Sequence, residues 1–206
     1  MAQNLGNINL KNKIETSTLA DKPEGFIGTY YLAENPQYYE PQRSNTFKFY
    51  VSSLNGLLEG WGVSTDTSED QALELSVKSS SVPHFQMEKI TINRGNNAMN
   101  FAGKPSFGDG SLVIHDYIGA HTKEILMAWQ RQAYNVETEK VGLAKDYKRT
   151  AYLLEYTPTF QLVRTWVLDG CWVSTISEGN YDHDSSDART IDATIIYDKA
   201  YIDTNP

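Results

Sequence analysis

The chain has 206 residues, 40% hydrophobic and 12% aromatic, a composition that fits a folded, sheet-rich protein and excludes a wholly disordered one. Its 26 acidic and 18 basic residues give a formal net charge of −8, which argues against a protein that grips nucleic acid through phosphates. No apolar run approaches the ~20 residues of a membrane-spanning helix, and the first residues lack a secretion-signal pattern. The sequence therefore predicts a single soluble domain, 1–206, made in a cytoplasm.

The N-terminal segment 1–45 predicts an extended arm. It is polar, it contains Pro23, Pro36 and Pro41, and it carries four tyrosines at positions 30, 31, 38 and 39. A cluster of aromatic rings inside a polar, proline-punctuated segment indicates an arm that becomes ordered by packing against another surface.

The first strand is expected directly after the arm. Phe47, Phe49 and Val51 alternate with polar residues, as in a strand with one buried face. The strand runs into Asn55-Gly56, a dipeptide that favours the tight turn of a hairpin. The sequence therefore predicts that a strand pair begins here.

The segment 62–81 predicts a long loop or hairpin region. Gly62–Glu69 is rich in Ser, Thr and Asp, which favours a loop. Leu73, Leu75 and Val77 then alternate with other residues, which indicates a strand over Ala72–Val77.

Three more strands and one helix are expected next. The strands are Met87–Ile92, Asn97–Phe101 and Ser111–His115, separated by glycine-containing turns. From Thr122 to Tyr134 the apolar spacing changes to that of a helix, and charged residues occupy the opposite side. The face expected to pack in the core comprises Ile125, Leu126, Trp129 and Ala133, with Tyr134 close to it.

Strand alternation returns after the helix, at 151–156 and 162–168, and Asp169-Gly170 reads as the turn that closes the second of these strands. The last strand has Ile191, Ala193, Ile195 and Tyr197 on one face. One helix inserted among runs of strands predicts a mainly β, α+β fold: an antiparallel β-sandwich or barrel with a flanking helix.

No catalytic, cofactor or metal site is predicted. Cys171, the single cysteine, has no histidine near it in sequence and reads as a small buried residue. The run Asp182–Asp187 offers carboxylates but lacks the glycine and terminal glutamate of a calcium loop, so an exposed loop is favoured. His115-Asp116 and His121 are interpreted as structural residues, because adjacent strand residues face opposite sides.

An ordered set of short motifs covers the C-terminal half. In chain order they are FAGKPSF (Phe101–Phe107), DYIG (Asp116–Gly119), Leu126-x-x-Trp129, KVGLAKDYKR (Lys140–Arg149), RTWVLDGCW (Arg164–Trp172) and IIYDKA (Ile195–Ala200). In this order and spacing the motifs resemble the tail tube proteins of contractile-tailed, myovirus-type bacteriophages.

The resemblance implies a structural virion protein, not an enzyme, that resides in the tail. Six subunits would pair strand edges into a ring, and stacked rings would form the conduit for genome delivery through the contractile tail. The implied partners are further copies of the chain, the sheath protein, a baseplate or tube initiator and a tape-measure protein, while DNA passes through without specific binding. An acidic ring suits that role, because it repels phosphate instead of trapping it.

Three other interpretations stay open. The chain could be a baseplate-proximal tube initiator, or the tube subunit of a type VI secretion or other contractile injection system. From a different class, it could be a β-sandwich hydrolase or carbohydrate-binding domain that uses the aromatic N-terminal segment or the Asp182–Asp187 run. For a tube, the polar row Asp192, Thr194 and Asp198 is the candidate for the face that lines the lumen, with an outward, solvent-facing row as the equal alternative.

Overall fold

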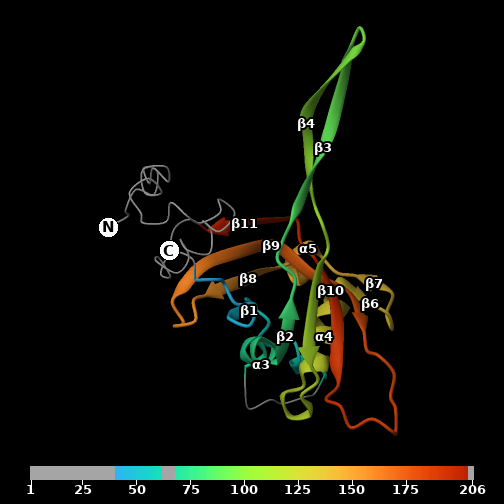
Figure 1. The fold of residues 1–206 in the computed structure, drawn as a ribbon. Coiled ribbons are helices and arrows are strands. Elements are labelled where there is room, and N and C mark those ends of the chain that lie inside the picture. Colours follow the sequence, from blue (N-terminus) through green and yellow to red (C-terminus); the bar gives the residue numbers. More distant parts are fainter. Residues whose placement is uncertain (1–39, 62–67, 204–206) are drawn as a thin grey trace, which may run out of the picture. The chain divides into compact units, whose positions relative to one another are not determined.

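The computed structural model describes residues 40–61 and 68–203. The chain divides into two units, Met1–Gln42 and Arg43–Pro206, and the architecture below is that of the second unit. Almost all of the predicted arm 1–45 lies outside the described residues, as does most of the predicted loop Gly62–Glu69. The mainly β, α+β fold with antiparallel pairing is confirmed (Figure 1).

Two four-stranded antiparallel layers form the body. The first layer, called sheet A, runs in the order β1, β8, β9 and β11. The second, called sheet B, runs β9, β10, β5 and β2. Their bounds are β1 Phe47–Val51, β2 Val77–Ser80, β5 Gly110–His115, β8 Arg149–Tyr156, β9 Leu162–Ser177, β10 Thr190–Ile196 and β11 Lys199–Asp203.

Strand β9 belongs to both sheets and bends between them at Gly170. Residues 162–171 pair with β8 or β11, whereas those from Trp172 onward pair with β10. Gly170 has φ +68°, a conformation that costs little only for glycine. The predicted hairpin turn at Asp169-Gly170 is therefore wrong: the dipeptide makes a bend that redirects one strand of 16 residues.

The core lies between the two sheets and helix α4 (Thr122–Ala133). The side chains of Ile125, Leu126 and Trp129 are fully buried, and the indole Nε1 of Trp129 donates to the backbone oxygen of Tyr147 at 2.7 Å. Ala133 is only half-buried, because the helix ends there. The prediction that Tyr134 also lies in the core is wrong, since this side chain is 47% exposed.

Helix α3 (Glu69–Ser76) occupies the segment where the strand Ala72–Val77 was predicted, so that prediction is wrong. The hydroxyl of Ser68 accepts a hydrogen bond from the amide of Gln71 and begins the helix. Ala72, Leu73 and Ser76 then fall on one buried face at helical spacing, while Leu75 is 74% exposed. Only Val77–Ser80 continues as strand β2.

The turn after β1 does not lead into a hairpin, which corrects the expectation at Asn55-Gly56. Strand β1 pairs with β8, about a hundred residues later. Leu54, Leu57 and Leu58 are buried and hold the turn against the core, and the chain continues into the short helix η4 (Glu59–Trp61). The side chains of Asp70 and Glu69 then accept hydrogen bonds from this turn.

Strands β3 (Phe85–Arg94) and β4 (Asn97–Phe107) form a long hairpin that projects beyond the sheets (Figure 1). Its tight turn contains Gly95 with φ +60°, at the position predicted from Gly95-Asn96. The strands are longer than the sequence suggested. The remaining elements are η5 (Ile118–Ala120), the small pair β6 (Tyr134–Asn135) and β7 (Lys140–Val141), and α5 (Ala144–Tyr147).

Candidate assembly surfaces

Cys171 and the loop Asp182–Asp187 have structural surroundings. Cys171 is buried, and burial raises the pKa of its thiol to about 12, so the reactive thiolate is disfavoured. The loop Asp182–Asp187 is exposed, and its side chains bond mainly within the loop. Over residues 40–61 and 68–203, no group of three His, Cys, Asp or Glu residues is placed to hold a metal ion.

The histidines before α4 have structural surroundings. His121 adopts φ +51° just before the helix, and its Nδ1 lies 3.9 Å from a carboxylate oxygen of Glu124. The backbone oxygen of His115 accepts a hydrogen bond from the hydroxyl of Thr122, which also accepts from the amide of Tyr117. This buried threonine therefore joins the end of β5 to the start of the helix.

Strand edges with a single partner are the first feature suited to assembly. Among the described strands of the two sheets, β1, β2 and β11 each pair with a single neighbour. An unpaired edge offers a row of amide and carbonyl groups to another chain. The edge strand β1 is also tied to helix α3, because Lys48 Nζ lies 2.9 Å from Glu74 Oε1.

The outward face of sheet A carries a row of tyrosine side chains. Tyr50, Tyr152, Val167 and Tyr201 are successive cross-strand partners at one level of the sheet. The rings of Tyr50 and Tyr152 stack with centroids 4.8 Å apart. The face also carries Lys48 and Lys199, whose ammonium groups pair with Glu74 and Asp169.

The outward face of sheet B is mostly polar around Asp192 and Thr194. Ser177, Asp192, Val113 and Ser79 are cross-strand partners at one level, and Thr175, Thr194 and Ser111 at the next. On the inward face, Ile191, Ala193 and Ile195 are buried.

The three residues of the predicted lumen row do not share one face. Asp192 and Thr194 lie on the outward face of sheet B. Asp198 lies beyond the end of β10, where its carboxylate is 2.7 Å from Lys148 Nζ and beside Gly170. It therefore belongs to the bend between the sheets.

The β3–β4 hairpin exposes large apolar side chains. Ile90 is opposite Phe101 and Ile92 is opposite Met99, so all four share one face of the outer half of the hairpin. Each is about half exposed, between 47% and 51%. The hairpin also carries three basic residues, Lys89, Arg94 and Lys104, and one acidic residue, Glu88.

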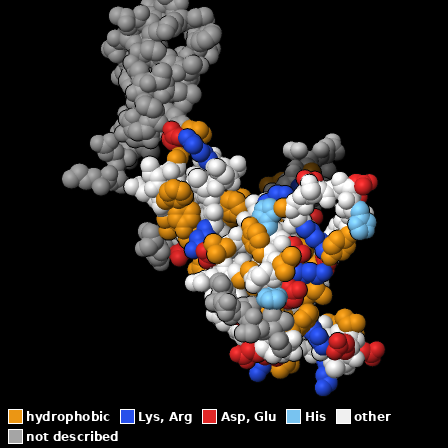
Figure 2. Space-filling model, turned by 90° about the horizontal axis from the view of Figure 1, so that it is seen from below, with side chains coloured by type: hydrophobic (Ala, Val, Ile, Leu, Met, Phe, Trp, Pro, Cys, Tyr) orange, Lys and Arg blue, Asp and Glu red, His pale blue; other side chains and the backbone are white. Residues whose placement is uncertain are grey.

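The opposite end of sheet B has its own exposed apolar residues. His115 at the end of β5 pairs with Thr190 at the start of β10, and the amide of Asp116 donates to the oxygen of Arg189. Next to this junction, Ile118 is 90% and Tyr181 is 82% exposed. Seen from below, the molecule shows apolar side chains set among charged ones (Figure 2).

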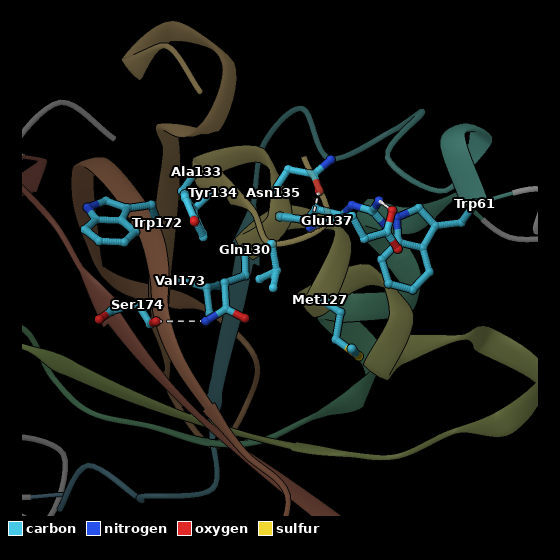
Figure 3. Close-up of a pocket in the computed structure, with 12 residues that line it drawn as sticks. Trp61, Met127, Gln130, Ala133, Tyr134, Asn135, Glu137, Trp172, Val173 and Ser174 are labelled. Carbon is cyan, nitrogen blue, oxygen red and sulfur yellow. Dashed lines mark hydrogen bonds and ion pairs between the residues drawn. The ribbon is translucent and has the colours of Figure 1, made fainter. Parts of the chain in front are cut away.

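A cleft of about 510 Å³ opens between α4, the β6–β7 pair and β9, and nothing in the sequence patterns predicted it (Figure 3). Gln130 donates to the backbone oxygen of Ser174 at 2.8 Å, and Arg131 pairs with Glu137. These polar groups satisfy one another. The remaining wall is largely apolar, formed by Trp61, Met127, Tyr134, Val136 and Trp172.

Comparisons with known proteins bear on these surfaces. No protein-family model matches the sequence. Tail tube protein gp19 of Enterobacteria phage T4 is 24% identical over 131 residues, which span 62% of this chain and 80% of the relative. The tail tube protein gp19 of Enterobacteria phage T6 matches with the same identity and coverage.

Solved structures agree on the fold. A chain of the sheath–tube complex of an extracellular contractile injection system superposes with a TM-score of 0.58, at 15% identity, over 83% of this chain and 96% of that one. A chain of the anti-feeding prophage cap gives 0.57, at 14% identity, over 80% and 91%. The chain is thus similar in sequence to phage tail tube proteins and shares its fold with components of contractile injection systems, which confirms the resemblance carried by its motifs.

Proposed function

We propose that the protein is the subunit of an inner tail tube, whose stacked rings form the conduit for genome delivery in a contractile tail. The observation that carries the proposal is the similarity to tail tube proteins over 80% of their length. The fold similarity to a sheath–tube complex supports the same function. A hydrolase or carbohydrate-binding function has no support from either comparison.

Assembly replaces catalysis in this proposal. Edge strands such as β1, β2 and β11, which have a single partner among the described strands, are an aggregation hazard in a monomer when left open, and closure of a ring removes open edges. Six copies per ring are proposed, with the sheath, a baseplate initiator and a tape-measure protein as further partners. A tube initiator, or the tube of another contractile injection system, would use the same surfaces.

The outward face of sheet B is the better candidate for the lumen. Its serine and threonine hydroxyls and Asp192 offer DNA no cationic contact. The outward face of sheet A instead offers the stacked rings of Tyr50 and Tyr152, which are suited to stacking with bases. A conduit has to let DNA move, so a face that binds it would oppose the function.

Electron microscopy of the purified protein over a range of concentrations tests the function. We expect hollow rings that stack into tubes, with neither nucleotide nor metal added. A particle that stays monomeric at high concentration, even with a tube-initiating complex as seed, would contradict the proposal.

The lumen assignment has a separate test. In Asp192→Lys tubes, a ring of lysines would attract phosphate, so genome exit should slow, and slow most at low salt, where screening is weak. Asp146→Lys, at an exposed position on α5, is the matched control. Genome exit at the parental rate at every salt concentration would show that Asp192 does not line the lumen.

A further inference from the structure

The dipeptide Asn55-Gly56 carries a chemical liability as well as a turn. Among the asparagines of the sequence, Asn55 alone is followed by glycine. Asparagine is a thermolabile residue, and glycine, which has no side chain, lets its backbone nitrogen approach the asparagine amide closely. Both residues are exposed to water, and Gly56 has φ +87°. The dipeptide is therefore a candidate for spontaneous deamidation.

Deamidation at such a dipeptide proceeds through a cyclic imide. The backbone nitrogen of Gly56 loses its proton and bonds to Cγ of Asn55, while Nδ2 of Asn55 takes up one proton and leaves as ammonia. Water then opens the imide at one of its two carbonyls, which gives aspartate or isoaspartate. One water is consumed and one ammonia is released, so the reaction needs no oxidant, reductant or cofactor.

The folded chain holds both reacting groups on carboxylates at the start of α3. Nδ2 of Asn55 donates to Oδ2 of Asp70 at 2.9 Å, and the amide of Gly56 donates to Oε1 of Glu69 at 3.1 Å. The other oxygen of Asp70 accepts from the amide of Leu54 at 2.7 Å. Glu69 is only 9% exposed, so its carboxylate is held in place under the turn.

These contacts oppose imide formation in two ways. Ring closure requires Nδ2 of Asn55 and the amide of Gly56 to leave charged acceptors, which form strong hydrogen bonds. The reaction also develops negative charge, first on the nitrogen of Gly56 and then on Oδ1 of Asn55, beside two groups that are already negative. The turn is anchored as well, because the amide of Leu57 donates to the oxygen of Leu54 at 3.2 Å and both leucines are buried.

We propose that Asn55 is the deamidation site of this chain and that Asp70 and Glu69 keep it unreacted in the folded subunit. The inference goes beyond the tube function and does not depend on it. Deamidation would replace the donor Nδ2 by an oxygen and put a third carboxylate beside Asp70 and Glu69. Isoaspartate would also lengthen the backbone of the turn by one methylene. Either product should weaken the contact between the turn and α3.

Mass spectrometry of the peptide that contains residue 55 measures the reaction, since an acid replaces an amide. The parental protein is incubated in native buffer and, in parallel, in urea. Deamidation of Asn55 should be slower in the folded protein by at least about a hundredfold, because two hydrogen bonds to charged groups are lost together on unfolding.

Two variants remove the charges and keep the shapes of the side chains. Asp70→Asn and Glu69→Gln should each raise the rate at Asn55 in native buffer about tenfold, since each weakens one hydrogen bond to a charged group. Glu74→Gln is the matched control. It removes a carboxylate from the same helix, one that pairs with Lys48 and not with the turn, and it should keep the parental rate.

Labelling of the Cys171 thiol separates a local effect from unfolding. The thiol is buried, so a thiol reagent reaches it only in unfolded chains. Faster deamidation of Asn55 with parental labelling of Cys171 is the expected result. Deamidation that rises only in proportion to Cys171 labelling would mean that the whole fold protects Asn55, and it would overturn the role of the two carboxylates.

Two other results would also overturn the proposal. One is the same rate at Asn55 in folded and unfolded parental protein. The other is the parental rate in both Asp70→Asn and Glu69→Gln. The damage expected from the reaction has its own measurement: Asn55→Asp, which reproduces one product, should unfold at a lower urea concentration than Asn55→Ser, which loses the amide without adding charge. Equal midpoints for these two variants would refute that expectation.

Discussion

Replacing Trp129 by alanine is expected to destabilise the subunit more than any surface change. The side chain is completely buried among α4, the sheets and α5, and its indole donates a hydrogen bond of 2.7 Å to the oxygen of Tyr147. Truncation of a buried tryptophan costs about 3–5 kcal/mol through lost contacts and the cavity left behind. For a chain of this size, such a loss lowers the melting temperature by roughly 10 °C.

Urea unfolding followed by fluorescence, at a concentration where the protein is monomeric, measures this loss without a contribution from assembly. Trp129→Phe is the matched control: it keeps most of the volume but leaves the Tyr147 carbonyl without its partner, for a cost of about 1–3 kcal/mol. If the Trp129→Ala protein has the same free energy of unfolding as the parental protein, α4 does not pack as described. If the alanine and phenylalanine variants lose the same free energy of unfolding, the hydrogen bond contributes more to stability than the packing does.

Three further outcomes are expected. Gly170→Ala should lower the free energy of unfolding by about 1–2 kcal/mol from the positive φ alone. It should lower it further because the new Cβ would lie 2.8 Å from Asp198 Cγ. Adding Asp198→Ala should remove only this steric contribution, and a full return to the parental stability would refute backbone strain. The thiol of Cys171 should react with a thiol reagent only after unfolding, since burial raises its pKa to about 12; prompt labelling of the native protein would contradict this. A hydrogen bond from Lys123, together with the charges of Lys123 and then Arg189, lowers the pKa of Glu178 below its ordinary 4.5. The stabilising contribution of Glu178 is therefore present above that value and disappears as pH falls through the lower folded pKa. Glu178→Gln should therefore reduce the loss of unfolding free energy in acid, and identical acid profiles would exclude this contribution.

Periodicity was a sound guide where an element is long or has one clearly buried face. Helix α4 begins at Thr122 as predicted, and the strand around Phe49 and Val51 has the expected buried face. In strand β10, the side chains of Ile191, Ala193 and Ile195 are buried, as the alternation indicated. These elements could be predicted because burial of one face, not local propensity, determines their pattern.

Two of the wrong predictions, the strand at Ala72–Val77 and the turn at Asp169-Gly170, have local physical causes. Leu73, Leu75 and Val77 match a strand, but eight residues are too few for alternation to exclude a helix. The signal for the helix was Ser68 followed by Gln71 three residues later, a capping pattern. At Asp169-Gly170, the left-handed glycine that suits a hairpin turn serves equally well to bend a continuous strand.

The assembly surfaces could not be located from the pattern, because alternation states that a strand has two faces but not what covers them. Ile90 and Ile92 in β3 alternate with polar residues much as Ile191 and Ile195 do in β10. The β10 side chains are buried because β10 lies between two strands and over the core, whereas β3 has only β4 beside it within the described chain, and its isoleucines are half exposed. A two-stranded hairpin is marginally stable in water on its own. Within the described residues, the apolar face of this hairpin therefore lacks the packing that buries the isoleucines of β10.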